Sequence, residues 1–214
     1  MNRIQATLGI AGVIVVIAAA LLLQHAPHER TVAARFWFDE VTFAVPGFGD
    51  TFGSSLSTTE RRAIEARTRA ELENAFAGFG IMFSDEPGAR YRVRVLQEFP
   101  PRRGWHRFAV AESVSMGAFG GEGSISFTAV ASRAIGNAPV GATRAVMIEG
   151  IARGLGRIAA HEFAHQLLHS VNLHASNDVQ SYEFRGANRA ALFYEPMHWA
   201  FAGALLLERL GPQL

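Results

Sequence analysis

The chain has 214 residues, of which 49 % are hydrophobic, so it is long and apolar enough to fold around a sizeable core and is not wholly disordered. Its formal net charge is only +1, and the basic residues are spread along the chain, which argues against a nucleic-acid-binding groove. The sequence has no cysteine, which excludes disulfides, thiolate metal ligands and a cysteine nucleophile.

Residues 1–24 predict a membrane anchor or signal segment. After Arg3 the sequence is uncharged from Ile4 to Leu23, and a helix of that length spans roughly 30 Å, about one hydrocarbon core. No clear cleavage site follows, so we favour an uncleaved single-pass anchor with an extracytoplasmic domain, and secretion after signal cleavage is the alternative. Residues 25–34 are predicted to be a linker, and residues 35–214 a single domain.

In the first half of this domain, the sequence predicts strands and one helix. Alternating hydrophobic residues indicate a strand at 35–45, before a glycine-rich connection at 46–55. Ser57 and Glu60 form a capping box, which predicts a helix from there to about Phe79. Further strands are expected at 91–99, 108–114 and 123–131. We expect residues 124–131 to form an exposed edge that takes an extended peptide by strand addition.

In the second half of this domain, the sequence predicts mainly helices. Hydrophobic residues at helical spacing indicate a long helix from about Thr143 to Val171. Three glycines inside it, at 150, 154 and 156, each cost about 1 kcal/mol relative to alanine, and a bend or close packing against the sheet would explain them. Residues 181–194 are a plausible helix, and 199–211 predict a final one. This element order predicts an α+β fold, in which helices cover a mixed sheet.

The segment His161-Glu162-Phe163-Ala164-His165 is an H-E-x-x-H motif on the predicted long helix. Histidines four residues apart are separated by about 6 Å along the helix axis and by about 40° around it, so both imidazoles reach one ion. Glu162 is placed to take a proton from a water on that ion, as a general base. A histidine-rich helix without chemistry is the alternative, but five of the 8 histidines lie between 161 and 198, which favours a metal site.

A catalytic zinc site needs three protein ligands and an open fourth position. His169 lies about 12 Å from His161 along the axis, too far for one straight helix to close a tetrahedral face. A turn at Asn172, which tolerates the left-handed conformation, would bring His174 back over the ion. We therefore expect His161, His165 and His174 to bind Zn²⁺.

This stretch resembles the metzincin clan of zinc metallopeptidases, particularly its matrixin-like branch. The clan reads H-E-x-x-H-x-x-G-x-x-H, then has a Met-containing turn and a final helix, after a twisted sheet with two helices. The resemblance implies a zincin-like fold and makes Met197 a candidate for the Met-turn. Here Leu168 replaces the glycine and His174 comes nine residues after His165 instead of six, so we expect the helix to run one turn longer.

The gluzincins are the rival resemblance, because they place a glutamate ligand on a downstream helix roughly twenty residues past the second histidine. Glu183 is the alternative third ligand in that case, while Asp178 and Glu195 are less favoured. Asp178 more naturally orients a ligand histidine without touching the ion. Tyr182 and Tyr194 are candidate donors to an oxyanion.

These observations predict a zinc-dependent peptidase that acts on a peptide or protein substrate outside the cytoplasm, at the membrane. A metal-activated water would attack the peptide bond with Glu162 as general base, then as acid to the leaving amine. The alternative function is a non-catalytic, zinc-binding, membrane-anchored interaction domain. Zinc content separates a chance motif from a metal site, and hydrolysis that depends on Glu162 separates the two metal-binding functions.

Overall fold

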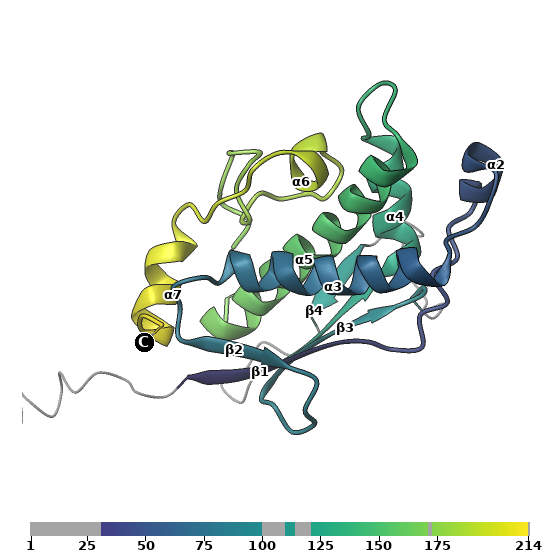
Figure 1. Ribbon diagram of the computed structural model, residues 1–214. Coiled ribbons are helices and arrows are strands. Elements are labelled where there is room, and N and C mark those ends of the chain that lie inside the picture. The colour runs from purple at the N-terminus through teal and green to yellow at the C-terminus, as the bar shows by residue number, and fades with distance from the viewer. Residues whose placement is uncertain (1–30, 100–109, 114–120, 171–172, 214) are drawn as a thin grey trace, which may run out of the picture. The chain divides into compact units, whose positions relative to one another are not determined.

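The computed structural model describes residues 31–99, 110–113, 121–170 and 173–213 (Figure 1). The predicted anchor, residues 1–24, lies outside the described residues. Within these four ranges no helix is both long and apolar enough to cross a membrane. The longest helix, α5 (Arg144–Leu168), has 25 residues, but arginine and glutamate side chains occur along it. On this finding the prediction of a single-pass membrane protein with an extracytoplasmic domain is corrected.

Five strands form one mixed sheet with the order β2-β1-β3-β5-β4. The strands are β1 (Val32–Phe38), β2 (Ile81–Ser84), β3 (Tyr91–Leu96), β4 (Ala111–Ser113) and β5 (Gly121–Ser126). The first three and β5 run parallel, and β4 pairs antiparallel with β5. The register aligns Phe36 with Val93 and Val93 with Gly123, so these residues lie in one row across the sheet. A mostly parallel sheet with helices is compatible with the predicted α+β class.

The strands predicted at 35–45 and 123–131 both end earlier in the structure. The strand expected at 35–45 ends at Phe38, because Glu40 (φ 52°) and Phe43 (φ 59°) adopt left-handed conformations that a strand does not allow. The strand expected at 123–131 ends at Ser126, whose hydroxyl accepts the N–H of Ala129 (3.3 Å) and starts a helix. Because β5 lies between β3 and β4, the prediction of an exposed edge at 124–131 is wrong.

Among the described residues before Arg144, three helices connect or cover the sheet. They are α2 (Phe48–Phe52), α3 (Thr58–Ala75) and α4 (Phe127–Gly136). The predicted capping box is confirmed, since Glu60 N–H donates to Ser57 Oγ (3.3 Å) and Ser57 N–H donates to the Glu60 carboxylate (2.7 Å). The same carboxylate accepts from Arg144 Nε (2.6 Å), so one glutamate joins the starts of α3 and α5.

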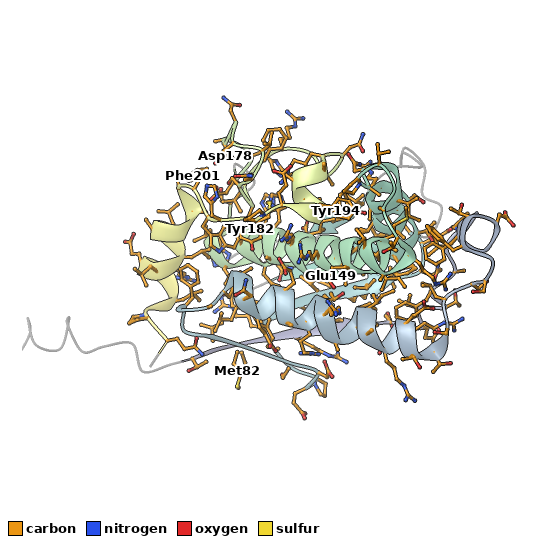
Figure 2. All side chains as sticks on the ribbon, turned by 45° about the horizontal axis from the view of Figure 1, so that its top comes forward. Met82, Glu149, Asp178, Tyr182, Tyr194 and Phe201 are labelled. Atoms are coloured by element: carbon orange, nitrogen blue, oxygen red, sulfur yellow. The ribbon has the colours of Figure 1, made fainter. Side chains whose placement is uncertain are left out.

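Helix α5 is the central element of the described domain and contacts β3, β4, β5, α3, α4, α6 (Ala190–Tyr194) and α7 (Ala202–Leu210). Its glycines allow close approach of other helices. A Cβ at Gly156 would lie 2.6 Å from the Thr68 carbonyl oxygen of α3, and one at Gly154 would lie 2.5 Å from the Phe193 ring of α6. The three glycines therefore reflect close packing against α3 and α6, where we had expected the sheet. Side chains fill the space between these layers, while Met82 points outward from β2 (Figure 2).

Candidate metal site and its pocket

Two of the expected metal ligands lie one helical turn apart near the end of α5. The Nε2 atoms of His161 and His165 are 3.0 Å apart, and their rings are nearly perpendicular. His165 is buried and His161 is half-buried. The spacing of the motif therefore directs both imidazoles to one point, as the helical geometry requires.

Helix α5 ends earlier than the sequence predicts. Its last residue is Leu168, and His169 adopts the left-handed conformation (φ 51°, ψ 39°) with its N–H donating to the His165 carbonyl. A single left-handed residue suffices to end a helix, so the extra turn is not formed, and the prediction that the helix continues to Asn172 is wrong. Asn172 itself lies outside the described residues. Between the second and third histidines this chain has three residues more than the metzincin motif. The additional residues come after the end of α5 and do not lengthen the helix.

The chain returns from this turn with His174 beside the other two histidines. Its Nε2 atom lies 2.9 Å from that of His161 and 3.3 Å from that of His165. Two nitrogens bound to one tetrahedral zinc at 2.0–2.1 Å are about 3.3 Å apart, so this triangle of nitrogens fits a single ion. The three histidines are thus close enough to bind a metal ion.

Hydrogen bonds on the far side of two rings determine which nitrogen faces the centre of the triangle. His161 Nδ1 lies 2.7 Å from the Tyr182 carbonyl oxygen, and His165 Nδ1 lies 2.6 Å from that of Ser170. A carbonyl only accepts, so each Nδ1 carries a proton, and the neutral ring then has a lone pair at Nε2. Two such lone pairs 3.0 Å apart repel one another, and a cation between them removes the repulsion.

The histidines are kept neutral by their surroundings. Burial lowers the pKa of His161 to about 3, and the neighbouring His165 adds to this effect. Burial also lowers the pKa values of His165 and His174. At neutral pH all three rings therefore present unprotonated nitrogens, which is the form that a metal ion requires.

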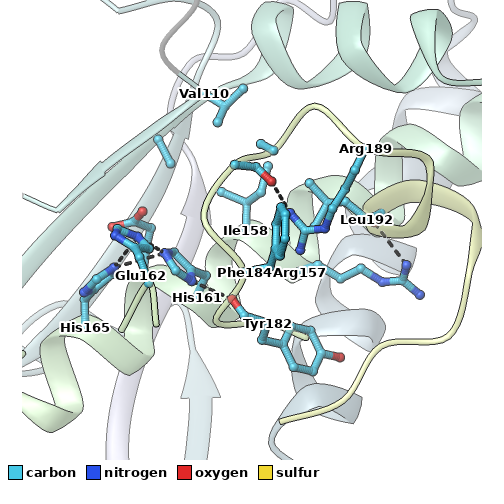
Figure 3. A pocket seen from close by; sticks show the side chains of 14 residues that line it. Val110, Arg157, Ile158, His161, Glu162, His165, Tyr182, Phe184, Arg189 and Leu192 are labelled. Carbon is cyan, nitrogen blue, oxygen red and sulfur yellow. Dashed lines mark hydrogen bonds between the residues drawn. The ribbon is translucent and has the colours of Figure 1, made fainter. Parts of the chain in front are cut away.

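The triangle opens into a pocket of about 360 Å³ (Figure 3). Glu162, only 6 % exposed, lines this pocket together with the histidines. The other walls come from β4, α5 and the segment before and within α6, and they include Val110, Ala111, Ile158, Phe184, Ala187 and Leu192. These six side chains are all apolar, so the pocket has a hydrophobic wall beside a carboxylate and three candidate metal ligands.

Two arginines bind backbone carbonyls of the segment 179–192, which forms one wall of this pocket. Arg157 is 5 % exposed, pairs with Glu71 of α3 (2.6 Å) and donates to the carbonyls of Ala191 and Leu192. Arg189 stacks on the ring of Phe184 and donates to three carbonyls, those of Val179, Ser181 and Gly186. Burial, and then the charge of Arg157, lower the pKa of Arg189 to about 10, so Arg189 remains charged at neutral pH.

The alternative third ligands are engaged elsewhere. The Glu183 carboxylate is fully buried and accepts the N–H groups of Ala200 (2.9 Å) and Ala202 (2.6 Å). The segment that carries it is not the helix predicted for 181–194, because only Ala190–Tyr194 is helical and Gly186 has a φ of 118°. Asp178 pairs with His198 (2.9 Å) and does not orient a ligand histidine, while Glu195 accepts from the side chain of Gln180 (2.9 Å).

The predicted oxyanion donors and the Met-turn candidate also lie away from the triangle. Tyr194 donates its hydroxyl to the Ala134 carbonyl (2.7 Å), and the ring of Tyr182 packs against Trp199 at a tilt and points away from the histidines (Figure 3). Burial raises the pKa of Tyr182 to about 12. Met197 packs partly buried against the core and lines a second pocket with both tyrosines. The contribution of Tyr182 to the site is its backbone carbonyl, for which side-chain reasoning has no signal.

Comparisons with protein-family models, with curated proteins and with solved structures find no match for this chain. The functional assignment therefore rests on the geometry of the chain itself. That geometry is a triangle of three histidines able to bind a metal ion, beside a buried carboxylate and a largely apolar pocket.

Proposed function

We propose that this protein is a zinc-dependent peptidase with a zincin-like fold. The observation that carries the proposal is the convergence of three imidazole Nε2 atoms, 2.9–3.3 Å apart, with Glu162 in the same pocket. Three neutral imidazoles suit zinc among the common metals and leave one coordination position open, as catalytic zinc sites do. The sheet with α3 and α5 on it is similar to the twisted sheet and two helices that the metzincin resemblance implies.

The roles of the chain's own groups follow from where they lie. When bound, zinc supplies the Lewis acidity that lowers the pKa of a water from about 15.7 towards 7. Glu162 accepts the proton of the attacking water and later gives it to the leaving amine, so that the same carboxylate acts as base and then as acid. The carbonyls of Tyr182 and Ser170 keep His161 and His165 in the orientation that directs Nε2 inward.

The edge of the sheet supports an extended peptide as the substrate. Strand β4 is hydrogen-bonded to β5 on one side and has no second neighbour within the described part of the sheet. Val110 and Ala111, at the start of this strand, line the pocket that contains the histidines. A peptide added along β4 would pass the triangle, and one of its side chains would enter the apolar pocket. The strand addition that we had expected at 124–131 is thus proposed for β4.

The test compares full-length wild type with Glu162→Gln in metal content and in hydrolysis of a mixture of unfolded proteins. Glutamine keeps the size of the side chain but does not accept a proton at neutral pH. We expect one zinc per chain in both proteins and a loss of hydrolysis of about 10² to 10⁴-fold in the variant, the usual contribution of a general base. Glu195→Gln is the matched control, because Glu195 is exposed and outside the pocket, and it should retain full activity.

Two results would contradict the proposal in different ways. Equal hydrolysis by wild type and Glu162→Gln would mean that the activity belongs to a contaminant. Bound zinc without cleavage of any protein in the mixture would instead favour a zinc-binding domain without catalytic function.

A further inference from the structure

Glu183 is a buried carboxylate for which peptide hydrolysis has no direct use. Its side chain is 0 % exposed and accepts the backbone N–H groups of Ala200 and Ala202, which precede and begin α7. It also accepts the hydroxyl of Ser181, which in turn accepts the Glu183 N–H (3.0 Å). Burying a carboxylate is unfavourable unless several donors satisfy it, so this arrangement fixes the 181–183 turn firmly on the start of α7.

The turn that Glu183 fixes is the one that contacts a metal ligand. Tyr182, its direct neighbour, accepts the Nδ1 proton of His161 through its backbone carbonyl (2.7 Å). Tyr182 is held from the other side as well, because its N–H donates to the His198 carbonyl (3.0 Å) and its ring packs against Trp199. The position of this carbonyl therefore depends on contacts made by the residues around it as well as on its hydrogen bond with His161 of α5.

We infer that Glu183 is a positioning residue for the metal ligand His161, acting through the carbonyl of Tyr182. By holding the turn, it keeps an acceptor at Nδ1 of His161, so that the proton stays there and Nε2 remains free for the ion. Such partners fix both the tautomer and the orientation of a ligand histidine, and their loss typically weakens metal binding about 10 to 100-fold. The inference rests on the metal site proposed above, but not on the peptidase reaction.

The alternative is that Glu183 only anchors α7 in the fold. In that case its replacement would lower stability without changing His161. His165 provides an internal reference, since its Nδ1 faces the carbonyl of Ser170, a residue outside the 181–183 turn. A specific effect on His161, with His165 unchanged, separates the two roles.

The experiment uses full-length Glu183→Gln, with Glu195→Gln as the matched control on the same stretch of chain. Glutamine keeps one acceptor oxygen but presents an amide donor to the second backbone N–H, so the turn should shift. In metal-free protein, long-range ¹H–¹⁵N NMR should show His161 protonated at Nδ1 in wild type and in the control, and a mixture of tautomers in Glu183→Gln. Titration with zinc should show an affinity about 10 to 100-fold lower for Glu183→Gln and unchanged for the control.

A folded Glu183→Gln protein with the wild-type His161 tautomer and wild-type zinc affinity would overturn the inference. If this variant does not fold, Ser181→Ala is tested in its place, because it removes one hydrogen-bond donor from the Glu183 carboxylate. This variant should still change the His161 tautomer measurably, and an unchanged tautomer would refute the positioning role of Glu183. Failure of the peptidase proposal is recognised separately. Zinc bound without hydrolysis leaves the tautomer result valid, and the absence of zinc binding by wild type refutes the metal site itself.

Discussion

Replacing Gly156 by alanine tests the close approach of α3 and α5. Alanine is favoured over glycine in a helix interior by about 1 kcal/mol, so without a clash the change would stabilise α5. The added Cβ, however, would lie 2.6 Å from the Thr68 carbonyl oxygen and 2.8 Å from Glu71 Cβ, and the first value is about 0.8 Å short of an ordinary 3.4 Å contact. Because the nearest atom belongs to the backbone of α3, the whole helix has to move.

Overpacking of this kind typically costs about 1–3 kcal/mol, against a gain of about 1 kcal/mol in helix propensity. We therefore expect Gly156→Ala to lower the free energy of unfolding by up to about 2 kcal/mol, and the melting temperature by a few degrees for a domain of this size. The shift of α3 would also disturb the pairing of Glu71 with Arg157 and hence the wall of the pocket.

The assay is urea and thermal unfolding of the metal-free protein, with Gly136→Ala as the matched control. Gly136 ends α4, and a Cβ there has no atom within 4 Å, so alanine should leave stability unchanged or raise it by up to about 1 kcal/mol. If Gly156→Ala proves as stable as Gly136→Ala, the close contact between α3 and α5 is wrong.

Three further outcomes follow from the site and from the charges around it. His174→Ala should weaken zinc binding strongly whereas His169→Ala should not, and equal losses in equilibrium dialysis would contradict the ligand assignment. The folded state lowers the pKa of His161 from 6.5 to about 3, so below pH 6.5 the unfolded chain binds more protons than the folded one. The metal-free protein should therefore lose stability as the pH falls from 6.5 towards 3, which urea unfolding at each pH would measure. The hydrogen bond from Arg144 lowers the pKa of Glu60 from 4.5 to about 2. The ionised carboxylate should therefore contribute about 1 kcal/mol to the free energy of unfolding above pH 4.5, and this contribution should be lost as the pH falls towards 2. The difference in stability between wild type and Glu60→Gln should vanish over the same range.

The sequence was informative wherever a side-chain pattern determines the structure. The H-E-x-x-H spacing, the capping box of Ser57 and the long apolar stripe of α5 each depend on residue type and periodicity, and each led to the observed element. His174 was predicted as the third ligand for a similar reason, since a tetrahedral site requires a ligand beyond the straight helix, and the structure places it close enough to the other two histidines to bind an ion with them.

The end of α5 was misjudged because residue type alone does not decide whether His169 or Asn172 becomes left-handed, since both types tolerate this conformation. Asn172 has the higher intrinsic tendency, yet His169 adopts this conformation, since the surrounding structure and not local preference selects it. The boundary between β5 and α4 was missed for another reason. The stretch 127–131 is short and mostly apolar, and over so few residues periodicity does not distinguish a buried strand from a buried helix.

The position of α5 in the fold affects how the protein acquires its metal. Most residues from Ile148 to Leu167 are buried between the sheet and the other helices, so this helix should exchange its amide hydrogens only on global unfolding. His161 and His165 are therefore in place as soon as the domain has folded, whereas His174 is exposed and lies beyond the end of this helix. We therefore expect a metal ion to be loaded, removed and reloaded without unfolding of the domain.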